Sequence, residues 1–162
     1  MKQRIPTIFL KMVIGFIGIA ALAFCVFLLP LFANEMAVIM PEWAFLKYPF
    51  LICMYVTMII FLVALYQAIR LIGYIDKGEV FSELSIKSLK NMKISGIMMT
   101  VLLYLSGMPV VYAEAQIEDA PGLVIIGFAI ASIPLVVATF VAVLQRLLQE
   151  ALEIKSENDF TV

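Results

Sequence analysis

The sequence contains no histidine, and it carries few charges for its length. Only 14% of its 162 residues are charged, whereas about 25% is usual in a soluble domain. The missing histidine removes the commonest general base and the commonest metal ligand. The net charge of −1 provides no overall field that would draw the protein to DNA or to anionic lipid. A disordered chain and a nucleic-acid-binding protein are therefore excluded for the chain as a whole.

Motifs of known catalytic sites are missing as well. The chain has no glycine-rich phosphate loop, no H-E-x-x-H zinc motif and no nucleophile elbow. Its four longest apolar stretches contain no Asp, Glu, Lys or Arg, and an ionisable group within the membrane is the usual sign of a proton or ion pathway. We therefore expect a protein without enzymatic activity, cofactor or bound metal. A proton-coupled transporter and a voltage sensor are disfavoured.

Cysteine is scarce, so a disulfide-stapled secreted module is excluded. The two cysteines, Cys25 and Cys53, lie in the outer halves of neighbouring apolar stretches, where their thiols could approach each other. They lack the C-x-x-C spacing of a redox pair, and we expect them to serve packing. The ten methionines offer soft ligands for copper, but filling of an apolar core explains them better.

Hydrophobic residues, in contrast, make up 64% of the chain, and the mean hydropathy is +1.09. A membrane-spanning helix needs about 20 mostly apolar residues, and four stretches qualify, namely 12–33, 48–69, 94–113 and 121–144. Strands of a closed barrel would be about 10 residues long with strict alternation, and these stretches show neither property. The sequence thus predicts an all-α membrane protein with four transmembrane helices in a single domain over residues 1–162.

The flanking charges predict which way the helices face. Ten of the eleven Lys and Arg residues lie in the leader, in the loop 70–93 or in the tail 145–162. Cytoplasmic loops of membrane proteins carry the excess of Lys and Arg, so both termini are expected in the cytoplasm. Cleavage of a signal peptide near Ala21 to Ala23 is an alternative. The first apolar run is, however, longer than the roughly 7–15 residues typical of the core of a signal peptide.

Two helix endings suggest that the chain consists of two tandem hairpins. The second and fourth stretches both end in the spacing V-A-x-x-Q, at residues 63–67 and 141–145. An old duplication in parallel orientation would explain this similarity. A general preference for Gln and Arg at inner helix ends would explain it equally well.

The loop 70–93 contains signals for a helix end and a helix start. Gly78 is expected to end the second helix, because glycine adopts the left-handed C-cap conformation readily. Ser82 is expected as the N-cap of a helix that lies partly along the membrane surface before it enters the membrane. In the tail 145–162 an apolar stripe continues the fourth helix, which we expect to fray near Ser156.

Several residues within the spans have a predicted structural role. Pro109 and Pro134 each remove a backbone donor and tend to kink their helices. The pairs Gly15 with Gly18 and Gly127 with Ala131 would allow close helix contact, either within one bundle or at the face of a homo-oligomer. Five hydroxyl groups are expected to bond to the backbone of their own helix: Thr57, Thr100, Ser106, Ser132 and Thr139.

The loop between the third and fourth spans is acidic, with Glu114, Glu118 and Asp119 and no cation. Glu114 and Glu118 would share a helix face at a spacing of four residues. Their carboxylates could bind a hard cation weakly, but a solvated acidic loop is the simpler interpretation.

Two short segments carry a resemblance to a known family. Residues 77–82 (KGEVFS) follow the second span, and residues 157–162 (ENDFTV) end the chain. In these motifs, and in its four spans with both ends inside, the chain resembles the bacterial membrane family called domain of unknown function 2975 (DUF2975). The family has no established activity, and its members are often encoded beside a small helix-turn-helix regulator. The resemblance therefore implies a protein of the bacterial cell membrane with a role in sensing or regulation.

The loop 70–93 and the tail 145–162 together suggest one cytoplasmic surface for a partner. A tail ending in an aromatic residue, a β-branched residue and a carboxylate suits capture in a groove of a partner. The tail could instead fold back, with Glu157 or Asp159 meeting Lys87 or Lys90, or remain a disordered terminus. The candidate partner-binding residues are Phe81, Ser82, Lys87, Lys90, Asp159, Phe160, Thr161 and Val162.

The sequence thus favours a small integral membrane protein with a non-enzymatic regulatory, sensing or immunity-type role that acts through partners at its cytoplasmic face. The partner would be a small helix-turn-helix regulator or another membrane protein, without direct contact to nucleic acid. A subunit of a transporter or channel is the alternative, although the uncharged spans do not support it.

Overall fold

The structure, a computed structural model, describes residues 4–161 and is all-helical over that range. Its four long helical stretches are Arg4–Ile39, Pro41–Asp76, Glu83–Ile117 and Gly122–Phe160. Each is long and apolar enough to cross a membrane, and each contains one of the four predicted spans, with Pro121 as the N-cap of the last. The expected fold of four transmembrane helices is therefore confirmed.

The first stretch is not a uniform α-helix. It consists of α1 (Arg4–Ala23), a π-helical segment (Phe24–Leu28) and α2 (Leu29–Ile39). The N–H of Leu29 bonds to the carbonyl of Phe24, five residues back. Pro30 follows directly and has no N–H to donate. The wider π turn accommodates this missing hydrogen bond. The sequence predicted one unbroken helix here.

The second stretch begins with a 3-10 segment (Pro41–Leu46) and continues as α3 (Lys47–Asp76). As predicted, Gly78 ends the helix, with a φ of 73°. The N–H of Gly78 bonds to the carbonyl of Ile75, and the N–H of Glu79 bonds to that of Tyr74. This pair of bonds is the Schellman motif, which favours glycine at the left-handed position.

The third helix, α4 (Glu83–Ile117), begins where the sequence predicted. Ser82 has an extended backbone, and its Oγ accepts a bond from the N–H of Ser85, as an N-cap residue does. The helix then runs without a break to Ile117. The segment before the span is part of this same helix, and Leu89 on it is buried.

The fourth helix, α5 (Gly122–Phe160), is longer than expected. It remains helical through Ser156, where fraying was predicted. The connection to α4 is short because Asp119 adopts a left-handed conformation with a φ of 50°. The N–H of Ala120 then bonds to the carbonyl of Ala115, which repeats the closure seen at Gly78 with an aspartate in the place of glycine.

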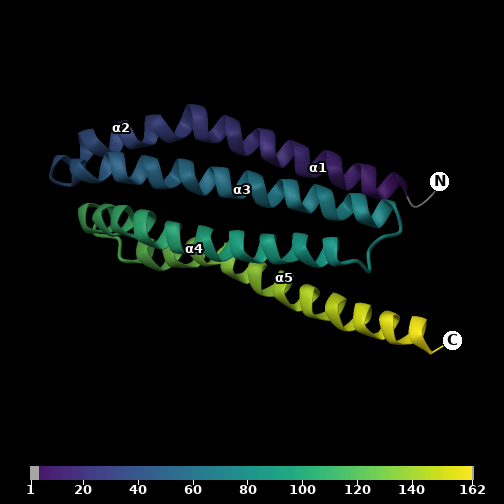
Figure 1. Ribbon diagram of the computed structural model, residues 1–162. Helices are drawn as coiled ribbons and strands as arrows, with labels where there is room; N and C mark the ends of the chain where they lie inside the picture. Colours follow the sequence, from purple (N-terminus) through teal and green to yellow (C-terminus); the bar gives the residue numbers. More distant parts are fainter. Residues whose placement is uncertain (1–3, 162) are drawn as a thin grey trace.

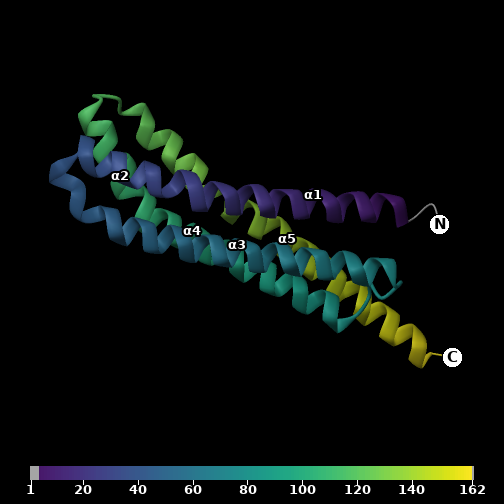
Figure 2. The ribbon, with the colours of Figure 1, turned by 90° about the horizontal axis from the view of Figure 1, so that it is seen from above.

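The helices are arranged as two antiparallel pairs (Figure 1). The first stretch pairs with α3, α4 pairs with α5, and α3 packs along α4 to join the two pairs. Both ends of the chain lie at the same end of the bundle in both views (Figures 1 and 2). We call this the terminal end, and we call the opposite end, with the connections 40–46 and 118–121, the hairpin end.

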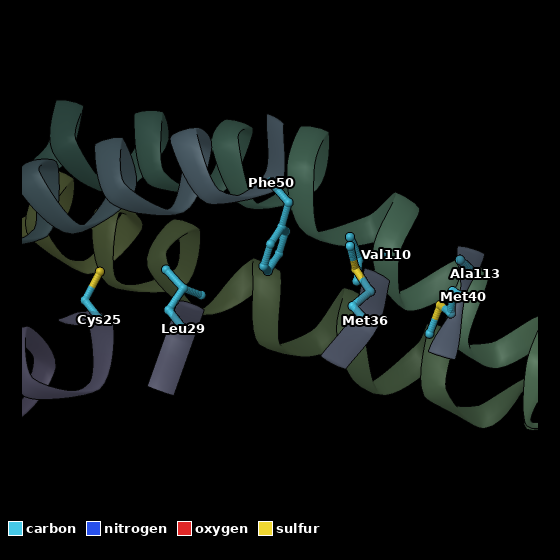
Figure 3. Packing of buried hydrophobic residues seen from close by; sticks show 7 residues of the cluster. All are labelled: Cys25, Leu29, Met36, Met40, Phe50, Val110 and Ala113. Atoms are coloured by element: carbon cyan, nitrogen blue, oxygen red, sulfur yellow. The ribbon is translucent and has the colours of Figure 1, made fainter. Parts of the chain in front are cut away.

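Buried apolar residues are few, and their main cluster lies towards the hairpin end. Figure 3 shows the main cluster, which consists of Cys25, Leu29, Met36, Met40, Phe50, Val110 and Ala113. α1 has no buried residue at all. Most large apolar side chains of the four stretches are exposed. Such a surface suits contact with lipid, since the bilayer removes the need to hide apolar groups from water.

α4 and α5 approach most closely at glycines. A Cβ atom added at Gly96 would lie 2.8 Å from the Cβ of Ala138 and 2.9 Å from the carbonyl oxygen of Pro134. One added at Gly127 would lie 2.8 Å from Val111, so the predicted close contact at Gly127 is confirmed. At Gly15, in contrast, an added Cβ would meet nothing within 4 Å. A close contact within the bundle is therefore not formed at Gly15.

All five hydroxyl groups singled out in the spans bond to the carbonyl four residues earlier in their own helix. One of them, Ser132, also bonds across helices, because its Oγ lies 2.5 Å from the hydroxyl of Tyr104 on α4. The predicted role is confirmed, and the bond between Tyr104 and Ser132 adds a polar link between α4 and α5. Pro109 and Pro134 both lie inside unbroken helices.

Candidate functional site

The terminal end carries a groove between the turn after α3 and the last turns of α5. It encloses about 380 Å³. Two of the predicted partner-binding residues, Phe81 and Asp159, lie on it together. The full lining consists of Phe81, Ala151, Ile154, Lys155, Asn158 and Asp159. We call this the terminal groove.

Phe81 is held in place by a network of serine bonds. Ser82 Oγ donates to the carbonyl of Glu79 at 2.8 Å, and Ser85 Oγ donates to the same carbonyl at 3.2 Å. Ser85 is fully buried. Since the chain is tied down on both sides of Phe81, the ring is presented at a fixed place, with 49% of its surface exposed. Ser82 therefore shapes the groove without lining it.

α5 supplies the other wall of the terminal groove. Ala151 and Ile154 are its apolar part, and Ile154 is 60% exposed. Lys155 and Asp159 lie on the same wall one helical turn apart. Among residues 4–161 the ion pairs are Lys11 with Asp76 and Arg146 with Glu150, so neither charge of the groove is paired within that range. The groove offers an apolar floor with one positive and one negative group.

The remaining predicted residues lie outside the terminal groove. Lys87 and Lys90 are exposed on α4 and do not line it. Phe160 is 88% exposed at the last residue of α5. The hydroxyl of Thr161 donates to the carbonyl of Glu157 at 2.8 Å, and Val162 lies outside the described residues. The predicted alternative in which the tail folds back on Lys87 or Lys90 is not formed, because α5 keeps its helical direction.

A second groove of about 410 Å³ lies between the start of α4 and the opposite face of α5. Its lining consists of Glu83, Ile86, Gln149, Leu152 and Glu153. The last turns of α5 thus have α4 on one face and the terminal groove on the other. The first face is held by α4, and the second is open to a partner.

One contact at the terminal end was not predicted from the sequence. Lys11 Nζ lies 2.6 Å from Asp76 Oδ2 and joins the first helix to the end of α3. Lys11 precedes the first predicted span, and Asp76 follows the second. Antiparallel pairing of these two spans would have predicted that the two residues lie close together.

Between Arg4 and Thr161, no three cysteine, aspartate or glutamate side chains gather in a way that could hold a metal ion. Cys25 is a buried free thiol that packs in the main apolar cluster, and Cys53 is a half-buried free thiol.

Comparison with known proteins places the chain among membrane proteins. It is 50% identical over 160 residues to "Uncharacterized membrane protein YoaS" from Bacillus subtilis (strain 168), an alignment that covers 99% of each chain. No solved structure matches. The family described as "Protein of unknown function (DUF2975)" matches residues 31–162. The chain is therefore a membrane protein and belongs to the DUF2975 family, as its motifs at residues 77–82 and 157–162 indicated.

Proposed function

We propose that this protein is a non-enzymatic regulatory or sensing protein that acts through a partner docked in the terminal groove. The observation that carries the proposal is the groove itself. It brings Phe81 from a rigid turn and Ile154 from α5 to one exposed apolar surface, with Lys155 and Asp159 beside it. Exposed apolar surface rimmed by charges is typical of protein interaction sites.

The distribution of charge supports a cytoplasmic position for this surface. Ten of the eleven Lys and Arg residues belong to the leader, the loop 70–93 and the tail 145–162, which meet at the terminal end. The positive-inside rule then places the terminal end in the cytoplasm of a bacterial cell. The partner is accordingly a small cytoplasmic regulator of the helix-turn-helix type or the inner face of another membrane protein.

The lining of the terminal groove supports binding over catalysis. Apart from Lys155 and Asp159, it consists of apolar side chains and the amide of Asn158. Its apolar part suits a large apolar side chain of a partner, and its two opposite charges suit a partner segment with charges of both signs. An immunity-type role, in which the partner is held inactive, belongs to the same class of function.

The direct test is photo-crosslinking in the native host with p-benzoylphenylalanine placed at Ile154. Leu147 serves as the matched control, because it is an equally exposed apolar residue of α5 (57%) that does not line the groove. We expect one specific adduct from position 154 and none from position 147, and Phe81→Ser should abolish the adduct. Adducts of equal intensity from both positions, or none from position 154, would contradict the proposal.

A subunit of a transporter or channel is the rival proposal. It requires a water-filled path, whereas the cavity of about 230 Å³ between α2, α3, α4 and α5 is lined almost wholly by apolar side chains. Cysteines introduced along α4 and α5, in a variant without Cys25 and Cys53, distinguish the two proposals. Periodic reaction with a water-soluble thiol reagent through the middle of both helices would favour the rival.

A further inference from the structure

Three neighbouring cavities at the hairpin end of the bundle share lining residues. The first, of about 230 Å³, lies between α2, α3, α4 and α5, and the second, of about 560 Å³, lies against α2 and α3. Phe32, Phe50 and Met54 line both of them. The third, of about 120 Å³, shares Phe32 with the other two and reaches the end of the bundle. We call the three together the hairpin cleft.

The deep part and the mouth of the hairpin cleft differ in chemistry. The two larger cavities are lined mainly by aromatic and aliphatic side chains. The smallest cavity is lined by apolar side chains and by three carboxylates, Glu35 from α2 and Glu114 and Glu118 at the end of α4. Glu35 also lines the second cavity. Glu114, which the sequence placed on one helix face with Glu118, also lines the first cavity. The cleft is therefore apolar inside and acidic at its mouth.

The three carboxylates have no partner within residues 4–161. None of them takes part in an ion pair or a side-chain hydrogen bond in that range. The one cation of the loops at this end, Lys47, lies over the ring of Tyr48, 5.3 Å from its centre. Glu35 and Glu118 are exposed, and Glu114 is half-buried. A cation in the cavity that all three line would be attracted by three negative charges.

We propose that the hairpin cleft binds a single-chain amphiphile with a cationic head group, which enters from the bilayer. The chain lies along Phe32, Phe50 and Met54, and the head group is held by Glu35, Glu114 and Glu118. Ligand sites commonly measure about 300–1,000 Å³ and combine apolar walls with a few polar groups. The two apolar cavities together fall in that range. An anionic head group is repelled at this mouth, so the charge selects the ligand.

This site is independent of the terminal groove. The cleft lies at the opposite end of the bundle and shares no lining residue with the groove. A failure of either proposal therefore leaves the other standing.

The test uses the full chain in nanodiscs of phosphatidylcholine and two probes with the same alkyl chain. Radiolabelled dodecyltrimethylammonium carries a positive head group, and dodecyl sulfate carries a negative one. Binding is measured by equilibrium dialysis below micellar concentrations, with empty nanodiscs to subtract partition into lipid. We expect the cation to bind about tenfold or more tightly than the anion, given the size of close charge interactions.

Two variants separate the head-group contacts from the apolar contacts. E35Q/E114Q/E118Q removes the charge at the mouth with almost no change in shape. E42Q is its matched control, since Glu42 is an exposed carboxylate of the same end that does not line the cleft. G107V narrows the deep part, because a Cβ at Gly107 would point to Met54 with an ordinary contact of 3.8 Å. Circular dichroism and size-exclusion chromatography establish that each variant is folded.

The proposal predicts that the triple variant loses the preference for the cation and that E42Q keeps it. It also predicts that G107V weakens the binding of both probes. Equal binding of the two probes to the unaltered protein would overturn the proposal. Undiminished binding of the cation by the triple variant would overturn it as well.

Discussion

Lys11 and Asp76, 65 residues apart in the sequence, form the ion pair that joins the first helix to the end of α3. The distance from Lys11 Nζ to Asp76 Oδ2 is 2.6 Å, and the side chains are 33% and 22% exposed. α1 contains no buried residue, so this pair is the main polar contact that fixes the start of the first helix on its neighbour.

Asp76→Asn should therefore lower the melting temperature of the purified protein in mild detergent. Glu150→Gln is the matched control, because the pair of Arg146 and Glu150 is far more exposed, at 81% and 56%, and exposed pairs contribute little. Differential scanning fluorimetry measures both variants. An equal effect of the two substitutions would show that the contact between Lys11 and Asp76 does not stabilise the bundle.

Gly96→Ala should destabilise the packing of α4 on α5. The added methyl group would lie 2.9 Å from the carbonyl oxygen of Pro134, and a backbone atom cannot turn aside as a side chain can. Overpacking of this kind costs about 1–3 kcal/mol. Gly15→Ala, where an added Cβ meets nothing within 4 Å, should be tolerated. Unfolding in a titration with denaturing detergent compares the two variants, and equal stability would refute the close approach at Gly96.

The two left-handed turns make opposite predictions. Gly78→Ala places a Cβ at a φ of 73°, and a left-handed conformation costs about 1–2 kcal/mol for a residue with a side chain. Asp119 already adopts a φ of 50°, so Asp119→Gly should leave the stability within about 0.5 kcal/mol. The same unfolding assay measures both. A neutral Gly78→Ala would indicate that the Schellman turn after α3 is not formed.

The sidedness of the bundle can be measured with cysteines placed at its two ends. In a variant without Cys25 and Cys53, a cysteine at Glu42 should react with a membrane-impermeant maleimide in intact cells. A cysteine at Ile154 should react only after the membrane is opened, because the positive charges keep the terminal end inside. The reverse pattern of labelling would place the terminal groove outside and remove the proposed cytoplasmic partner.

Removal of Phe160 to Val162 should impair retention of the partner without preventing insertion. Phe160 is 88% exposed, so its loss removes little contact within the bundle. The terminal groove itself ends at Asp159 and remains in the shortened chain. Affinity purification with an N-terminal tag compares the two forms, and unchanged recovery of the crosslinked partner would show that the end of the chain is not needed.

Much of this architecture could be predicted from the sequence because the bilayer imposes strong local constraints. Charge-free stretches of about 20 residues allow little besides a spanning helix. Gly78 and Ser82 act through their own backbone geometry, so the turn between α3 and α4 was also predictable. The hydroxyl groups in the spans bond to their own helices for the same local reason.

Features that depend on packing between helices could not be predicted in this way. Glu35 lies far from Glu114 in the sequence, and only the tertiary packing of the bundle brings both to the lining of one cavity of the hairpin cleft. The π-helical segment before Pro30 depends on how the hydrogen-bond pattern of the helix adjusts to the backbone N–H that Pro30 lacks. Phe81 and Asp159 of the terminal groove were among the predicted partner-binding residues. Ile154 and Lys155 were not, because their place in the wall of the groove depends on the straight course of α5.

The lack of buried side chains in α1 has a consequence for its sequence. A helix that faces lipid on most sides needs a certain length and hydrophobicity, but it does not need a particular order of apolar residues. The stretch between Met12 and Ala23 should therefore tolerate permutation of its residues, provided that Lys11 keeps its place opposite Asp76. α4 lies between two neighbours and cannot tolerate such permutation, so the information that specifies this bundle is concentrated outside α1.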